Sequence, residues 1–315
     1  MLKKIFFFLF FVPFLSACGV ATLSPTPTAT FFPTPTFTAA PIFTSTPDIW
    51  EIRKCRKAPS SVIDESFLIL NYTGDIERRG KMDMLLNFTE NNEILGFAFD
   101  FKKVREYKVN GCVEDRNFTM WLQQNGTVVA IVQGEFPKND PRHGYPSSKE
   151  LSFEVITGSL MEKDAVSSSL YLSFASVSSG TMDRRFVNMG VEDDTIILNA
   201  ARQFLAAIAN DDRDQAVKML NFPIQVQVGD EQQSLKTSDM FLKSYPAIFG
   251  NGFKERLAIT FPNYLIAYAG KNSDVISLSV YGGGEIGFDA EGRVTWIVNQ
   301  QDEISTPTAL PDESH

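Results

Sequence analysis

The stretch "KMDMLLNFTENNEILGFAFDF" at residues 81–101 decides the fold of the first half of the chain. Its apolar residues alternate with other residues at a period of two, first in "KMDMLLNF" and again in "ILGFAFDF". The polar "ENNE" between them is typical of a turn. Alternation with one apolar face indicates antiparallel strands that cover a core on one side. We expect a hairpin with two apolar rows facing a core: Met82, Met84, Leu86 and Phe88, then Leu95, Phe97, Phe99 and Phe101.

The same period recurs downstream without an intervening helical stretch. It is present in "NFTMWLQQ" (117–124), "KELSFEV" (149–155) and "SLYLSFAS" (169–176). Asn-Gly pairs at 110–111 and 125–126 favour tight hairpins, because both residue types tolerate positive φ. Closure of about eight such strands into a small barrel leaves no exposed edge. The sequence therefore predicts an all-β antiparallel meander or small barrel over residues 50–190.

The pattern changes to a helical period at residue 191. In "VEDDTIILNAARQFLAAIANDD" (191–212), apolar residues recur at spacings of four, three and four, which places them on one helix face. A short helix after Asp212, a strand "FPIQVQV" (222–228) and a third helix from 237 or 238 to about 249 follow. Five strands are expected next, at "RLAITF", "YLIAYA", "VISLSVY", "GEIGF" and "RVTWIV". We expect an α+β domain over residues 191–300, with helices packed on a curved antiparallel sheet.

Two stretches of this second domain resemble the nuclear transport factor 2-like superfamily. They are "AARQFLAAIANDDRDQAVKMLNFPIQV" (200–226) and "GGGEIGFDAEGRVTWIV" (282–298). The resemblance implies a curved sheet wrapped around helices. That fold supports enzymes, small-ligand binders and assembly modules, so it does not by itself name a function.

Enzymes of that superfamily place an acid, a histidine or a tyrosine inside the cone of the sheet. No histidine occurs between residues 144 and 314 of this chain, and we assign no catalytic residue. Aromatic side chains are the candidates for a pocket, although each is also explained as a half-buried residue of a strand or helix. The candidate pocket residues are Tyr245, Tyr264, Tyr268, Tyr281 and Trp296.

The first 17 residues are typical of a secretory signal peptide. Lys3 and Lys4 precede the apolar run "IFFFLFFVPFL" (5–15), and the small residues Ser16 and Ala17 follow it. The apolar run is shorter than the roughly 20 residues that a membrane-spanning helix needs. An uncleaved N-terminal anchor is the alternative.

The four residues "LSAC" (15–18) resemble the lipobox of bacterial lipoproteins. In such proteins the cysteine sulfur receives a diacylglyceryl group, and a further acyl chain such as palmitate makes the anchor stable. The resemblance implies that Cys18 is lipidated and that the chain is extracytoplasmic, anchored to the cell membrane by lipid. Residues 19–47 contain no charge and alternate proline with threonine. We expect residues 18–49 to be a disordered Thr/Pro-rich stalk and residues 301–315 to be a disordered tail.

Two further cysteines remain if Cys18 carries lipid. Cys55 and Cys112 would form one disulfide in an oxidising compartment, or stay as two buried thiols. Two cysteines are too few for a zinc site, so we expect no metal and no cofactor. The net charge of −9, with no basic run, argues against a nucleic acid partner.

These patterns favour a lipid-anchored extracytoplasmic bacterial protein. We expect a non-enzymatic binding or interaction module at the cell surface, whose partner is an envelope protein or a ligand. The alternative is a weak hydrolase or isomerase that uses the cone of the second domain. A solute-binding transporter component is disfavoured, because the chain lacks the alternating strand-helix units of two α/β lobes.

Overall fold

The structure is a computed structural model that describes residues 49–55, 68–138, 151–163, 165–250, 252–269 and 274–300. The predicted signal peptide, the lipidation site Cys18, most of the stalk and the tail lie outside these residues. No helix of the described part is long and apolar enough to cross a membrane.

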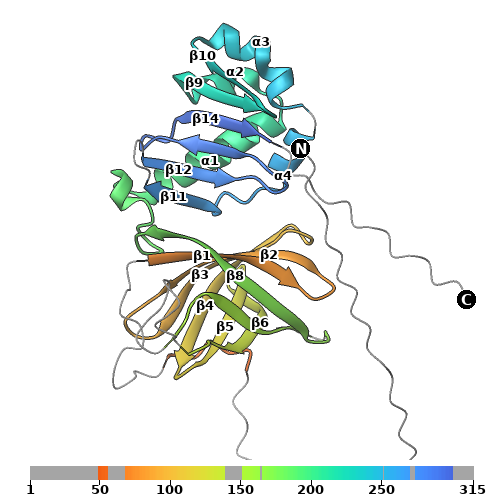
Figure 1. Cartoon of the computed structure of the whole chain (residues 1–315), viewed down its shortest axis with the longest axis vertical. Coiled ribbons are helices and arrows are strands. Elements are labelled where there is room, and N and C mark those ends of the chain that lie inside the picture. Colours follow the sequence, from red (N-terminus) through yellow and green to blue (C-terminus); the bar gives the residue numbers. More distant parts are fainter. Residues whose placement is uncertain are drawn as a thin grey trace, which may run out of the picture. The chain divides into compact units, whose positions relative to one another are not determined.

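A closed barrel of eight antiparallel strands occupies residues 68–179, as the alternating pattern predicted (Figure 1). Each strand pairs with its neighbour in sequence, and β1 pairs with β8 to close the barrel. The strands are β1 (Leu68–Ile76), β2 (Gly80–Phe88), β3 (Glu93–Asp100), β4 (Arg105–Glu114), β5 (Asn117–Gln124), β6 (Thr127–Glu135), β7 (Val155–Glu162) and β8 (Ser168–Ser179).

The interior of the barrel is filled by side chains. Met82, Met84, Leu86 and Phe88 of β2 all point into this core, as expected, and none is more than 2% exposed. An eight-stranded barrel is just wide enough for side chains to fill it.

The prediction that the apolar row of β3 faces the barrel core was wrong. Residues that pair directly across two strands share a face, and Met84 pairs with Ala98 while Leu86 pairs with Gly96. The small residues of β3 therefore point inward, opposite the large side chains of β2. The apolar row Leu95, Phe97, Phe99 and Phe101 stands on the outer wall of the barrel.

A second correction concerns the predicted strand "KELSFEV". In the described part of this stretch, Leu151 forms an isolated bridge with Lys138, and regular pairing begins at Val155, the start of β7. The side chains of Leu151 and Phe153 still enter the barrel core. The Tyr72 hydroxyl, inside the barrel, donates a hydrogen bond to the Phe153 carbonyl at 2.9 Å.

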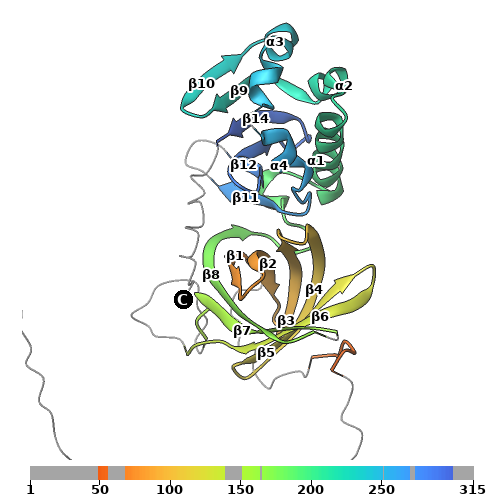
Figure 2. The same ribbon diagram turned by 90° about the vertical axis from the view of Figure 1, so that its right-hand side faces the viewer.

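The second region combines helices with a six-stranded sheet, and α1 runs across one face of that sheet (Figure 2). A short 3-10 helix, η1 (Val187–Met189), precedes it. The helices are α1 (Asp194–Ala209), α2 (Arg213–Lys218), α3 (Ser238–Ile248) and α4 (Phe253–Ala258). The strands are β9 (Leu220–Val228), β10 (Glu231–Leu235), β11 (Leu265–Ala269), β12 (Asp274–Ser279), β13 (Glu285–Phe288) and β14 (Val294–Asn299).

The sheet is mixed, whereas the sequence had predicted an antiparallel one. Its strand order is β10-β9-β14-β13-β12-β11, and β14 pairs with β9 in parallel. Helices α3 and α4 lie between β10 and β11 in the chain, and β11 forms the other edge of the sheet. The four strands from β11 to β14 then lead back to the middle of the sheet, where β14 meets β9.

Two more expectations differ from the structure. "RLAITF" was predicted as a strand, but its first residues belong to α4, whose Phe253 and Leu257 are buried at a helical spacing of four. Strand β10 was not predicted, because only Leu235 of its five residues is buried and no apolar alternation marks it. It is an edge strand, held by its pairing with β9.

The helices and sheet enclose a core of apolar side chains. Asp193 caps α1 by accepting a hydrogen bond from the Thr195 amide at 2.9 Å. The predicted apolar face of α1 is buried, including Ile197 and Phe204 at 0% exposure. Phe241 and Phe253 lie in the same core.

A disulfide holds the segment at residues 49–55 on the outer wall of the barrel. Cys55 is bonded to Cys112 of β4, with the two Cα atoms 5.3 Å apart. Beside it, the Trp121 indole Nε1 donates a hydrogen bond to the Ile49 carbonyl at 2.9 Å. Trp50 packs against the same patch of the wall. The described segment that precedes the barrel is thus fastened covalently to β4, which pairs with β3 and β5.

Loss of this disulfide should destabilise the protein. Cysteines 57 positions apart close a long loop, and cross-linking a loop of this size lowers the entropy of the unfolded chain by an amount worth about 4 kcal/mol. We expect that decrease in the free energy of unfolding for the double variant Cys55→Ser, Cys112→Ser, measured by guanidinium denaturation. Cys18→Ser is the matched control and should unfold like the original protein. Equal midpoints for the double variant and the original protein would contradict the prediction.

Candidate functional site

The outward apolar row of β3 lies between two hollows of the described surface. Phe99, at 0% exposure, and Phe101 are covered by Phe261 and Tyr264 of the second region. The Phe99 ring lies 5.4 Å from that of Phe261 and 4.7 Å from that of Tyr264, measured between centroids. One hollow lies at each end of the row.

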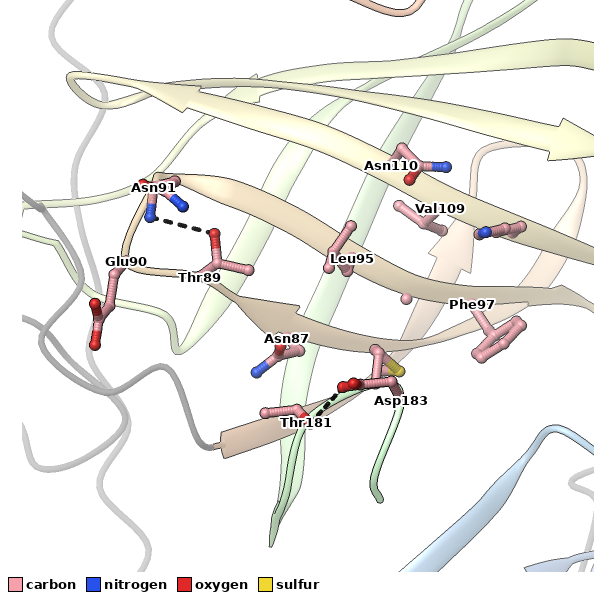
Figure 3. A pocket seen from close by; sticks show the side chains of 13 residues that line it. Asn87, Thr89, Glu90, Asn91, Leu95, Phe97, Val109, Asn110, Thr181 and Asp183 are labelled. Carbon is pink, nitrogen blue, oxygen red and sulfur yellow. Dashed lines mark hydrogen bonds between the residues drawn. The ribbon is translucent and has the colours of Figure 1, made fainter. Parts of the chain in front are cut away.

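The first hollow is a groove of about 630 Å³ on the barrel wall (Figure 3). Leu95 and Phe97 of β3 give it an apolar floor, and the segment 181–183 forms one side. Its polar side chains mostly stabilise their own turns. Thr181 donates a hydrogen bond to Asp183 and holds the pKa of that carboxyl below its usual value. The Thr89 hydroxyl accepts one from the Asn91 amide at 3.3 Å.

The second hollow is a cleft of about 580 Å³ at the Phe101 end of the row. Side chains from the barrel and from the second region line it together. We call it the junction cleft. Its lining includes Asn71, Lys81, Asp83, Phe101, Gln227, Tyr264, Tyr281, Glu285 and Trp296.

Asp83 is the buried charge of the junction cleft. It is 1% exposed, and its Oδ2 accepts a hydrogen bond from the Tyr264 hydroxyl at 2.6 Å. The Lys81 ammonium lies 3.5 Å from the same oxygen. A carboxylate out of water needs such partners, because an unpaired buried charge is strongly destabilising. The other oxygen, Oδ1, has no hydrogen-bond partner within the described residues.

Lys81 links this carboxylate to an aromatic stack. Its Nζ lies 5.4 Å from the centroid of the Phe101 ring and 5.9 Å from that of Tyr281. The two rings are stacked with centroids 4.6 Å apart and planes at 16°. The negative faces of the rings attract the ammonium group. The positive charge in the cleft is therefore already balanced by Asp83 and the two rings.

The indole of Trp296 on β14 packs directly over Gly287, the residue opposite it on β13, where any side chain would clash with the indole. A Cβ atom on Gly287, its partner in β13, would stand 1.2 Å from the indole Nε1. Gly284 also lets the loop before β13 approach β14, since a Cβ there would lie 2.5 Å from the Val298 carbonyl oxygen and its φ is +114°. The Trp296 Nε1 is buried without a hydrogen-bond partner in the described part of the chain.

Glu285 is the remaining acid of the junction cleft. It begins β13 and is half-buried. Burial raises the pKa of its carboxyl above the usual value, because the charged form is poorly solvated there. No salt bridge involving Glu285 is found among the described residues.

The five predicted pocket residues do not form one site. Tyr264, Tyr281 and Trp296 line the junction cleft together. Tyr245 lies in the core of the second region at 3% exposure, where burial raises its pKa to about 12. Tyr268 belongs to β11, and its side chain is outside the described residues. The lipidation site Cys18 is outside them as well.

Sequence reasoning missed the barrel side of the junction cleft. Lys81 and Asp83 alternate with the apolar residues of β2 and so lie on its outer face, and the second region covers that face at the cleft. An available signal was the neighbouring row of Phe97, Phe99 and Phe101 on a strand whose other face is also largely apolar. A strand apolar on both faces indicates burial on both sides.

Comparisons with known proteins returned no match: no family model, no curated protein and no solved structure is similar to this chain. Within the described residues, no group of three or more histidine, cysteine, aspartate or glutamate side chains is placed to hold a metal ion.

Removing the Tyr264 hydroxyl should weaken the fold. Tyr264→Phe takes away a donor from the buried Asp83 carboxylate, and a hydrogen bond to a charged group contributes about 1.5–3 kcal/mol. Chemical denaturation near neutral pH measures this loss. Tyr281→Phe is the matched control, since it removes a tyrosine hydroxyl from the same cleft without touching Asp83. An equal loss of unfolding free energy in both variants would show that the Tyr264–Asp83 hydrogen bond does not stabilise the fold more than the loss of any tyrosine hydroxyl in the cleft.

Glu285 should make stability depend on pH. Its pKa is raised in the folded state, so the contribution of Glu285 to the free energy of unfolding is fully present at pH values below the usual pKa of 4.5. That contribution is lost as pH rises through the folded pKa. Glu285→Gln removes the ionisation, and we expect this variant to be the more stable protein near neutral pH and to lose that advantage under acid conditions. Unfolding free energies of both proteins across this pH range test the point. A difference in unfolding free energy between the two proteins that stays constant with pH would contradict the prediction.

Proposed function

We propose that this chain is a lipid-anchored extracytoplasmic bacterial protein that acts as a non-enzymatic binding module at the cell surface. The junction cleft is the observation that carries the binding role. It gathers aromatic rings, an ion pair and the half-buried Glu285 in one hollow. Its partner in this proposal is an envelope component, either a protein or a ligand.

The anchor rests on the sequence and is supported by the disulfide. The "LSAC" motif at residues 15–18 is where lipid would attach, through the sulfur of Cys18. Disulfides persist in oxidising compartments outside the cytoplasm, and the Cys55–Cys112 bond fits such a location. The uncharged Thr/Pro stretch would act as a semi-rigid spacer between the lipid and the barrel.

The chemistry of the cleft favours binding over catalysis. Lys81, Asp83 and Tyr264 interact with one another, so none is poised as an independent base or nucleophile. No histidine or cysteine is among the described residues that line the cleft. The alternative of a weak hydrolase or isomerase needs an open cone in the second region, where Phe204 and Phe241 are fully buried in the core.

Palmitate labelling tests the proposed anchor. Cells that express the full chain are grown with radiolabelled palmitate and separated into membrane and soluble fractions. We expect label in the protein and recovery with membranes, and loss of both in Cys18→Ala. The double variant Cys55→Ala, Cys112→Ala is the matched control, and any of it that accumulates should be labelled. An unlabelled original protein, or a Cys18→Ala variant that stays with membranes, would refute the anchor.

A further inference from the structure

Glu285 is the acid of the junction cleft that the described residues leave unpaired. Its carboxyl makes no hydrogen bond or ion pair with them, and burial is the only cause that raises its pKa. Its carboxylate oxygens are accessible from the cleft. A half-buried carboxylate costs stability unless a cation or hydrogen-bond donors compensate for the lost water. An accessible, uncompensated acid in a cleft therefore points to a ligand that supplies the missing positive charge.

The other charges of the cleft balance each other. Lys81 is the single basic side chain among the described lining residues, and its ammonium lies 3.5 Å from the Asp83 carboxylate. Glu285 has no such counterpart among the described residues. The described lining therefore carries one net negative charge, and the whole chain carries a net charge of −9. This field attracts a cation and repels an anion.

The strand register places an aromatic ring beside Glu285. Glu285 lies directly opposite Val298, two residues beyond Trp296 on β14. The acid and the indole therefore stand on one face of the sheet as diagonal neighbours, and both line the cleft. The indole Nε1 is buried, so the half-buried side chain presents carbon to the cleft. Tryptophan is the best aromatic partner for a cation, and the Lys81 ammonium lies over other rings.

Neutral side chains on the same face add hydrogen-bond acceptors. Ser279 of β12 lies directly opposite Glu285, and its hydroxyl group lines the cleft. Gln227 of β9 lies opposite Val298 on the next strand. Its amide nitrogen donates to the Gly229 carbonyl at 2.9 Å, which leaves its oxygen as an acceptor. An ammonium ion has three N–H donors, so it can bind the carboxylate and still donate to a neighbouring side chain.

We propose that the junction cleft binds an organic cation through an aliphatic ammonium group. The ammonium donates hydrogen bonds to the Glu285 carboxylate, and the carbon chain of the ligand lies on the carbon surface of Trp296. The volume of about 580 Å³ lies within the range of roughly 300–1,000 Å³ typical of ligand sites. The inference rests on the proposed function and names the class of ligand that the cleft takes.

Titration with aliphatic amines tests the proposal. The full chain in nonionic detergent micelles is titrated with cadaverine, and binding is followed by calorimetry. We expect saturable binding, whereas pentanediol, the neutral diol of the same length, should not bind measurably. A second titration uses Nα-acetyl-lysine-N-methylamide, which carries the same ammonium on a peptide unit. Tighter binding of cadaverine supports a free amine as the ligand, and tighter binding of the lysine derivative supports a lysine side chain.

Removing the charge of Glu285 should weaken this binding. Glu285→Gln keeps the size of the side chain, and we expect it to fold because loss of the half-buried charge stabilises the protein near neutral pH. The affinity for cadaverine should fall at least about tenfold, equivalent to about 1.4 kcal/mol. Glu231→Gln is the matched control, because it removes an exposed negative charge on β10, outside the cleft. This control should bind cadaverine like the original protein.

A second variant tests the aromatic side of the site. Trp296→Phe keeps an aromatic ring but gives a smaller surface and a weaker attraction for a cation, so we expect weaker binding of cadaverine than in the original protein. Failure of both amines to bind at millimolar concentration would overturn the proposal, as would unchanged affinity in either variant. Binding of pentanediol as tightly as cadaverine, or of Ca²⁺ in place of the amines, would overturn it too.

The outcome can be separated from that of the anchor experiment. A protein that incorporates palmitate but binds neither amine refutes the amine inference and leaves the anchored module standing. A protein that binds amines through Glu285 without incorporating palmitate refutes the anchor and supports the ligand class.

Discussion

Phe99 is fully buried although it stands on the outside of a barrel, because Phe261 and Tyr264 of the second region pack against it. The arrangement of the junction cleft depends on this contact. The interior of an eight-stranded barrel is just wide enough for side chains to fill it. Here β2 supplies the large side chains and β3 supplies Gly96 and Ala98 opposite them. The phenylalanines of β3 are left outside, where Phe261 and Tyr264 remove them from water. Burial of each such ring contributes about 1.5–3 kcal/mol.

This packing brings separated parts of the chain into one site. Tyr264 follows α4 in sequence, yet its hydroxyl meets Asp83 of β2, 181 residues away. Nearby, the buried Arg185 guanidinium donates a hydrogen bond to the Asn263 carbonyl at 2.8 Å. Asn263 in turn donates to the Glu106 carboxylate of β4. Apolar contacts flanked by such hydrogen bonds hold the two walls of the junction cleft in a defined geometry.

A different part of the barrel wall holds the segment that precedes the barrel. Segment 49–55 is fixed by the Cys55–Cys112 bond and by the Trp121–Ile49 hydrogen bond. In an anchored protein, a pull on the preceding chain would reach β4 through this bond before it reached β1. Because β4 pairs with both β3 and β5, a covalent link to it would spread that load over two ladders of the barrel.

The sequence by itself determined the local structure. Period-two alternation predicted the antiparallel barrel, and the helical spacing from Ile197 to Ile208 predicted α1, because both patterns report which side of an element meets a core. It could not assign the apolar row of β3, since alternation shows that a face is buried but not what covers it. It also could not predict the parallel pairing of β14 with β9, a contact that depends on where α3 and α4 return the chain. Only the tertiary structure brought Tyr264 to Asp83 and Lys81 of β2, because side chains 181 residues apart meet only after both cores have packed.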